Sequence, residues 1–188
     1  MKTTSILLLV LLFTQQLFST PKDFPSPPEG FTWKHIEEIK GAFLSPIDWY
    51  YKETRKNNTL GIFITKENID KEGMFLTGFT VNILKNVKQS TNMAPSEFAY
   101  KFISTASKSK PVVKEMWSNN MGPFTAYGVR LKNEDKQLGD YITHHLVIAN
   151  DSTGTVYMCI FEAPEKAWAT AWKQGEVIMQ KLFIDSTI

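Results

Sequence analysis

The residues of this chain that could carry out chemistry are few. It has three histidines, His35, His144 and His145, and a single cysteine, Cys159. His144 and His145 are neighbours in a β-rich run, so their side chains would point to opposite faces of a strand and could not hold one metal ion together. We expect one imidazole to face solvent or the polar side of a sheet and the other to pack in the core. No metal site and no cofactor are predicted.

Glu162 is the acidic residue that comes closest to a catalytic group, because it stands at the end of a predicted strand and could act as a general acid or base. A charge at the start of a helix that opens at Pro164 is the simpler explanation. The chain contains no HExxH, GxSxG, P-loop, GxGxxG or CxxC pattern. No catalytic residue is therefore assigned, and the weak candidates for a site are His35, His144, His145 and Glu162.

Cys159 cannot form an intramolecular disulfide, because the chain has no second cysteine. It lies in the apolar run 156–161, where a thiol commonly acts as a small buried hydrophobe. A reactive thiol needs a nearby base or an electropositive, partly exposed surrounding, and the sequence shows neither. We expect Cys159 to be inert and the fold to be stabilised by packing.

The first 19 residues predict export. Lys2 is followed by the unbroken apolar run 6–13 (ILLLVLLF) and then by a short polar stretch that ends in small residues, as in a secretory signal peptide. The run is shorter than the roughly 20 residues that span a bilayer, and no later segment comes closer. We predict a signal peptide over residues 1–19 and a secreted or periplasmic mature protein without a membrane span. The alternative, an N-terminal core helix, would show an amphipathic stripe.

The remaining chain suits one domain, since 43% of the whole sequence is hydrophobic and 13% is aromatic. Loss of Lys2 with the leader leaves 20 basic against 19 acidic residues, a net charge of +1. Nucleic-acid binding is not expected, because no clustered basic surplus is present to displace counterions from phosphates. The lysines of the stretch 101–114 are interpreted as the solvated end of a helix and a loop. We expect a monomer whose partner is an unknown protein or small molecule.

Residues 20–30 (TPKDFPSPPEG) hold four of the nine prolines and are predicted to form a linker, with the domain over residues 31–184. Turn chemistry explains the asparagines of two sequons, Asn57 and Asn150, without glycans.

Short connections between predicted strands favour antiparallel pairing. Alternation and short β-rich runs predict strands over 42–45, 50–54, 60–66, 77–84, 112–117, 125–131, 141–149 and 155–162.

Two helices are expected to interrupt these strands. The first has Pro95 in its first turn. The second is expected to open at Pro164 and to reach Leu182, because apolar residues recur on one face at 168, 171, 172, 175, 178, 179 and 182. This stripe is interpreted as the cover of a sheet, and a lining for a ligand pocket is the alternative. Gly175 within the stripe indicates a close approach of the helix backbone to the sheet.

The stretch 41–49 (GAFLSPIDW) resembles the Gly-aromatic-apolar-x-Pro-x-x-Trp opening of PsbP-like domains, a family named after an extrinsic photosystem II subunit. The end of the chain, 157–182, also resembles theirs, with a strand that enters Ala163-Pro164-Glu165 and a long helix bearing Trp168. The resemblance covers roughly residues 33–184. It implies an α+β fold with an antiparallel sheet between helices, an α/β/α sandwich, and non-catalytic binding or accessory roles. No binding residue of that family has a counterpart here.

We therefore expect an exported, non-catalytic binding or accessory module. Two alternatives stay open: a secreted hydrolase whose site joins His35 or His144 to Glu162, and a carrier of a small apolar ligand. A pocket with convergent polar groups would favour the hydrolase. An elongated dry cavity would favour the carrier, and a flat exposed aromatic patch would favour docking of a protein partner.

Overall fold

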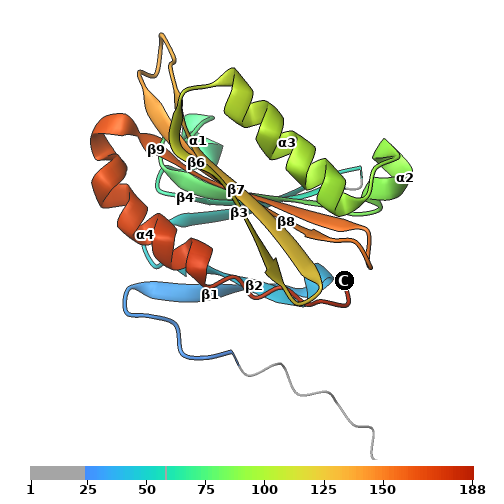
Figure 1. Cartoon of the computed structure of the whole chain (residues 1–188). Helices are drawn as coiled ribbons and strands as arrows, with labels where there is room; N and C mark the ends of the chain where they lie inside the picture. Colours follow the sequence, from blue (N-terminus) through green and yellow to red (C-terminus); the bar gives the residue numbers. More distant parts are fainter. Residues whose placement is uncertain (1–23, 58) are drawn as a thin grey trace, which may run out of the picture.

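The computed structural model of the protein describes residues 24–57 and 59–188, so the predicted signal peptide, residues 1–19, lies outside the described residues. Within them, one large antiparallel sheet has seven strands (Figure 1). Their spatial order is β3 (Tyr50–Lys56), β4 (Thr59–Thr65), β5 (Gly78–Leu84), β9 (Thr155–Pro164), β8 (Tyr141–Asn150), β7 (Phe124–Asn133) and β6 (Val112–Met121).

A separate antiparallel hairpin and the helices complete the domain. The hairpin consists of β1 (Phe31–Ile36) and β2 (Gly41–Pro46). The long helices are α3 (Pro95–Ser109) and α4 (Trp168–Gln180). The short elements are α1 (Ile69–Glu72), α2 (Val87–Thr91) and the 3-10 turns η1 (Glu37–Ile39) and η2 (Glu165–Ala167). No helix in the described part of the chain is long and apolar enough to cross a membrane.

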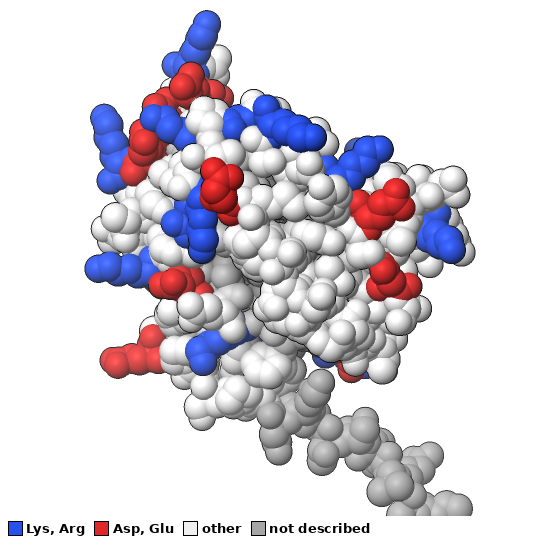
Figure 2. Space-filling view, viewed as in Figure 1, with Lys and Arg blue, Asp and Glu red and all other residues white. Residues whose placement is uncertain are grey.

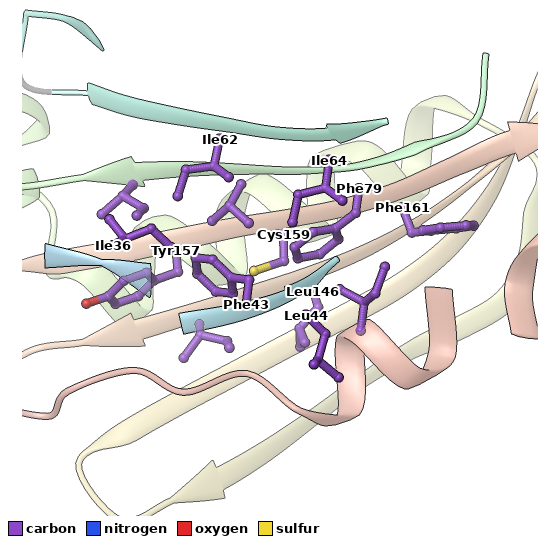
Figure 3. Close-up of a cluster of buried hydrophobic side chains, with 14 of the residues drawn as sticks. Ile36, Phe43, Leu44, Ile62, Ile64, Phe79, Leu146, Tyr157, Cys159 and Phe161 are labelled. Atoms are coloured by element: carbon purple, nitrogen blue, oxygen red, sulfur yellow. The ribbon is translucent and has the colours of Figure 1, made fainter. Parts of the chain in front are cut away.

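Alternate residues of the strands enter two hydrophobic cores, because successive side chains of a strand point to opposite faces. On β9, Tyr157, Cys159 and Phe161 lie in the core beneath α4 and the β1–β2 hairpin (Figure 3), whereas Val156 lies in the core beneath α3. α3 contacts β7 and β8, and α4 contacts β9 and β2. We call the two faces of the large sheet the α3 face and the α4 face.

The structure agrees with the predicted content of strands and helices. All eight predicted strands are present and their pairing is antiparallel. α3 has Pro95 in its first turn, as predicted. The prediction that Cys159 is buried is also confirmed, since its exposed fraction is 0%.

Several boundaries differ from the sequence expectations, and one strand was not expected. The last helix begins at Trp168, because Pro164 still pairs with Tyr141 as the end of β9 and η2 follows it. Proline is tolerated both at a strand end and in the first turn of a helix, so the proline alone could not fix this boundary. Lys114 lies in β6, in agreement with the predicted strand 112–117 and not with the loop expected at the end of the stretch 101–114. β1 has no counterpart among the predicted strands.

Helix α4 lies close to the sheet at Gly175, as the sequence indicated. A Cβ atom added to Gly175 would lie 2.7 to 2.8 Å from three ring atoms of Phe161 on β9. Real Cβ atoms do not approach other atoms so closely, so any larger residue would push the helix away from the sheet. The absence of a side chain at this position therefore sets the distance between α4 and the α4 face.

We predict that Gly175→Ala destabilises the protein by about 1 to 3 kcal/mol, the usual cost of overpacking a core. The loss should appear even though alanine is favoured over glycine within a helix by about 1 kcal/mol. Urea unfolding of the purified variant measures the change. Thr170→Ala, at an exposed position of the same helix, is the control and should leave stability unchanged or slightly raised. A Gly175→Ala variant as stable as the unmodified protein would contradict the close contact.

Candidate functional site

The candidate residues named from the sequence lie apart in the structure. His35 is on β1, where its ring lies 4.7 Å from that of Phe24. Glu162 is directly opposite Thr143 in the sheet register, so both belong to one face, and His144 belongs to the other. The β1–β2 hairpin also covers the face opposite Glu162. The structure therefore brings neither His35 nor His144 to Glu162, and the site expected for a hydrolase is not assembled.

Both neighbouring histidines are largely buried, on opposite faces of β8. His145 lies beside Phe102 of α3, and its Nε2 is 3.0 Å from Oγ1 of Thr143. Burial lowers the pKa of His145 to about 4. His144 is only 6% exposed, and burial together with the charge of Arg130 lowers its pKa to about 3. Neither imidazole faces solvent, and both are neutral near pH 7.

Glu162 and Cys159 are placed by β9. Glu162 lies within the strand and not at the start of a helix, beside Tyr141 and Leu138, so the helix-start explanation is wrong. Burial raises the pKa of its carboxyl group.

Burial also raises the pKa of the Cys159 thiol, which is fully enclosed in the core. A protonated and enclosed thiol is a poor nucleophile. The described residues contain no group of three or more His, Cys, Asp or Glu side chains placed to hold a metal ion.

The two sequon asparagines differ in exposure. Asn150 is fully buried, and its Nδ2 donates a hydrogen bond of 2.9 Å to the carbonyl oxygen of Ser186. Attachment of a glycan would break this contact. Asn57 is exposed after β3, with a left-handed φ of 52° that asparagine tolerates well.

Arg130 is the residue that the sequence analysis did not single out. The chain has two arginines. Arg55 is exposed and forms ion pairs of 3.2 Å with Glu38 and with Glu53. Arg130 forms no ion pair or hydrogen bond with the described residues. Its burial lowers the pKa of its guanidinium, while the charge of Glu176 acts in the opposite direction.

Two tryptophans of α4 hold this guanidinium. Its Cζ lies 4.3 Å from the centre of the Trp172 ring and 5.0 Å from that of Trp168. The two rings are stacked on each other with centres 5.3 Å apart, because positions four apart on a helix share one side. Arg130 on β7 is directly opposite His144 on β8, and the ring of His144 lies 4.6 Å from that of Trp172. The sheet register and α4 together assemble this cluster.

A third indole, that of Trp117, lies on the same sheet face beside these residues. It lies on β6 opposite Gly128 of β7, and a Cβ atom on Gly128 would lie 2.3 Å from its ring. The ring therefore covers Gly128, which lies two residues before Arg130 on the same face. We call Trp117, Arg130, His144, Trp168 and Trp172 the Arg130 cluster.

Unpartnered polar atoms concentrate in this cluster. Six buried side-chain nitrogen or oxygen atoms of the described residues have no hydrogen-bond partner. Three of them are Nε1 of Trp117, Nε of Arg130 and Nδ1 of His144. Buried polar atoms are nearly always hydrogen-bonded, and each exception has a cost of about 1 to 3 kcal/mol. These three exceptions belong to nearby positions on one face of the sheet.

An apolar groove borders the Arg130 cluster. It has a volume of about 360 Å³ and no charged residue in its lining. Trp117 belongs to both the groove and the cluster, and Leu146 of the groove comes two residues after His144 on β8, about 7 Å along the strand. Figure 2 shows few charged side chains in the centre of this view, whereas acidic and basic side chains lie around it. The lining consists of Trp117, Asn119, Met121, Phe124, Leu146, Ile148, Met179, Gln180, Leu182 and Ile184.

Comparison with solved structures identifies the class of fold. Cyanobacterial PsbP (CyanoP) from Synechocystis has a TM-score of 0.51 and 10% sequence identity, over 83% of this chain and 93% of that chain. A Bacteroides thetaiotaomicron protein has a TM-score of 0.43 at 14% identity, over 86% of this chain and 47% of its own. A Pseudomonas aeruginosa protein of unknown function has a TM-score of 0.40 at 14% identity, over 78% and 94%.

The chain therefore has a PsbP-like fold, as its resemblance to that family predicted. No family model and no curated protein sequence matches it. At 10% identity the likeness to CyanoP shows the fold alone. The chemistry of the site has to be argued from the residues of this chain.

We predict that the buried neutral His144 makes the protein less stable in mild acid. An unfolded histidine takes up a proton below pH 6.5, whereas His144 in the native state does so only near pH 3. Its contribution to stability is thus complete above pH 6.5 and is lost as the pH falls, by roughly 2 kcal/mol between pH 7 and pH 5. The free energy of unfolding of the unmodified protein and of His144→Gln should be compared at both values.

The variant comparison isolates His144 from its neighbours. Glu162, with its raised pKa, acts in the opposite direction, and His145 contributes in the same direction as His144. Both effects remain in His144→Gln and cancel in the difference. The variant should therefore lose roughly 2 kcal/mol less than the unmodified protein on acidification. An identical loss in both proteins would show that His144 is not a buried neutral group.

Proposed function

We propose that this protein is an exported, non-catalytic binding module, built as a PsbP-like α/β/α sandwich, that holds a small molecule in the groove beside α4. The observation that carries the proposal is the Arg130 cluster. It places a cation without an ion-pair partner and three unpartnered polar atoms next to an apolar groove of about 360 Å³. The apolar leader sequence supports action outside the cytoplasm.

The energetics of Arg130 favour a ligand. Partial burial of a guanidinium removes water from it, and that loss is normally offset by a carboxylate. Here the offset comes from two indole rings, each worth about 0.5 to 2 kcal/mol, and from the charge of Glu176, which forms no ion pair with Arg130. An anionic group bound at the cluster would restore the missing interactions, so the site gains more from such a ligand than a satisfied surface would.

Of the other functions that the sequence left open, the geometry favours a carrier of a small ligand over a hydrolase or a protein-docking surface. A hydrolase site is not favoured, because Glu162 lies on the α3 face and His144 on the α4 face. Docking of a protein through exposed aromatic residues is not favoured either. Among the described residues, the aromatic side chains in the set of exposed large hydrophobics are Tyr50 and Tyr100, on β3 and α3. The apolar groove favours the carrier, which is one form of binding module.

A neutral apolar probe tests the groove independently of its charge. We expect N-phenyl-1-naphthylamine to bind the purified protein with one-to-one stoichiometry and a rise in fluorescence. Asn119→Trp should weaken this binding by about tenfold or more, because Asn119 lines the groove and a bulky ring would fill it. Fluorescence titration at pH 7 gives the affinity.

Asn120→Trp is the matched control. Asn120 is also exposed on β6, but its side chain points to the α3 face, since neighbouring strand residues alternate. The control should bind the probe like the unmodified protein. Absence of saturable binding, or equal weakening by the two substitutions, would refute the groove as the binding site.

A further inference from the structure

We infer that the ligand is a single-chain amphiphile with a carboxylate head, bound with its head at Arg130 and its alkyl chain along the groove. The inference rests on the proposed function, because it names the chemical class of the molecule held in that groove. Three features of the described residues support this class of ligand: the hydrogen-bond donors of the Arg130 cluster, the net charge around them, and the apolar lining of the neighbouring groove.

The donors of the cluster fit a carboxylate. Nε of Arg130 and Nε1 of Trp117 each carry one hydrogen that only an acceptor can satisfy, and both are buried and unpartnered. A carboxylate offers two acceptor oxygens and pairs with the planar guanidinium through charge-assisted hydrogen bonds. Nδ1 of His144 is a third unpartnered atom at this place, and its neutral ring adds no charge. A neutral head such as an alcohol would leave the guanidinium without a counter-charge.

The charges around the cluster favour one negative charge in the head. Arg130 is the cation in contact with the indoles, and Lys114 on β6 is exposed but close enough to act on His144. Glu176 on α4 acts on Arg130 with the opposite sign. The cluster therefore carries close to one net positive charge, which matches a carboxylate and would leave a doubly charged phosphate partly uncompensated.

The shape and lining of the groove favour a single alkyl chain. From Trp117 and Leu146 it continues beside Ile148 and Phe124 to Ile184, and none of the lining residues is charged. Gly128 and Phe124 on β7 are four residues apart, which corresponds to about 13 Å along the strand. A volume of about 360 Å³ is at the lower end of the range for ligand sites and suits one chain of medium length better than a lipid with two chains.

The test is displacement of N-phenyl-1-naphthylamine by decanoate, decan-1-ol and decyl phosphate. We expect decanoate to bind the unmodified protein about tenfold or more tightly than decan-1-ol, the usual gain from a charge-assisted hydrogen bond. Arg130→Gln should abolish this preference while the alcohol keeps its affinity. Arg130→Lys, which keeps the charge but loses the planar fork, should give an intermediate preference.

Arg55→Gln is the control for loss of an arginine, because Arg55 lies on the surface with its own acidic partners, and it should bind all compounds normally. Binding of the neutral probe to Arg130→Gln shows that the groove of the variant is intact. Equal affinities for decanoate and the alcohol in the unmodified protein, or an unchanged preference in Arg130→Gln, would overturn the carboxylate assignment while leaving the groove in place. Tighter binding of decyl phosphate than of decanoate would also overturn it.

Discussion

The contact between Gly175 and the ring of Phe161 is the constraint on which the rest of the α4 face depends. Because the helix carries no side chain at this point, its backbone comes close to β9. Trp168 and Trp172 lie on the same side of the helix, about two turns and one turn before Gly175, and the close approach of the helix places both rings against Phe161. A helix further from the sheet would leave Arg130 and His144 uncovered.

This packing couples the stability of the fold to the properties of the site. Trp168 is 9% exposed and belongs to the core, whereas Trp172 is only partly buried and packs at its margin. The same two rings that cover the sheet also shield Arg130 and His144 from water. The sheet register places this cation directly beside this neutral imidazole. The sequence posed core packing and ligand binding as alternatives for this stripe. In the structure one tryptophan pair covers the core and also borders the proposed site, so the two roles are compatible.

The strands and helices could be predicted because each leaves a local pattern. Short windows of sequence contained the apolar period of the last helix and the alternation along β8 and β9. They also contained Gly175, which indicated the close approach of the helix to the sheet. The strand β1 was missed, because it follows directly on a proline-rich stretch and has no strongly apolar run. The start of α4 was misplaced since Pro164 suits a strand end as well as a helix start.

The site could not be predicted from such windows. Arg130 has nothing unusual next to it in the sequence, and its surroundings come from β6, β8 and α4. Its importance depends on the register that sets it opposite His144 and on the crossing of α4 above both. Neither is encoded in spacing along the chain. The available signal was the position of an arginine within a predicted strand. The chain has two arginines and five tryptophans, and Arg130 lies in β7, where most side chains are buried or partly buried.

The shared fold does not determine the side chains of the proposed site. A PsbP-like arrangement at 10% identity fixes where the helices and strands run, but the side chains that meet between them belong to each chain. A hydrophobic residue at position 130 would satisfy the packing under Trp168 and Trp172 without any cost of desolvation. The presence of a guanidinium there, next to two further unpartnered polar atoms, is therefore not required by the fold. Because a hydrophobic residue could pack there without losing hydration, we propose ligand binding as the explanation for this charge.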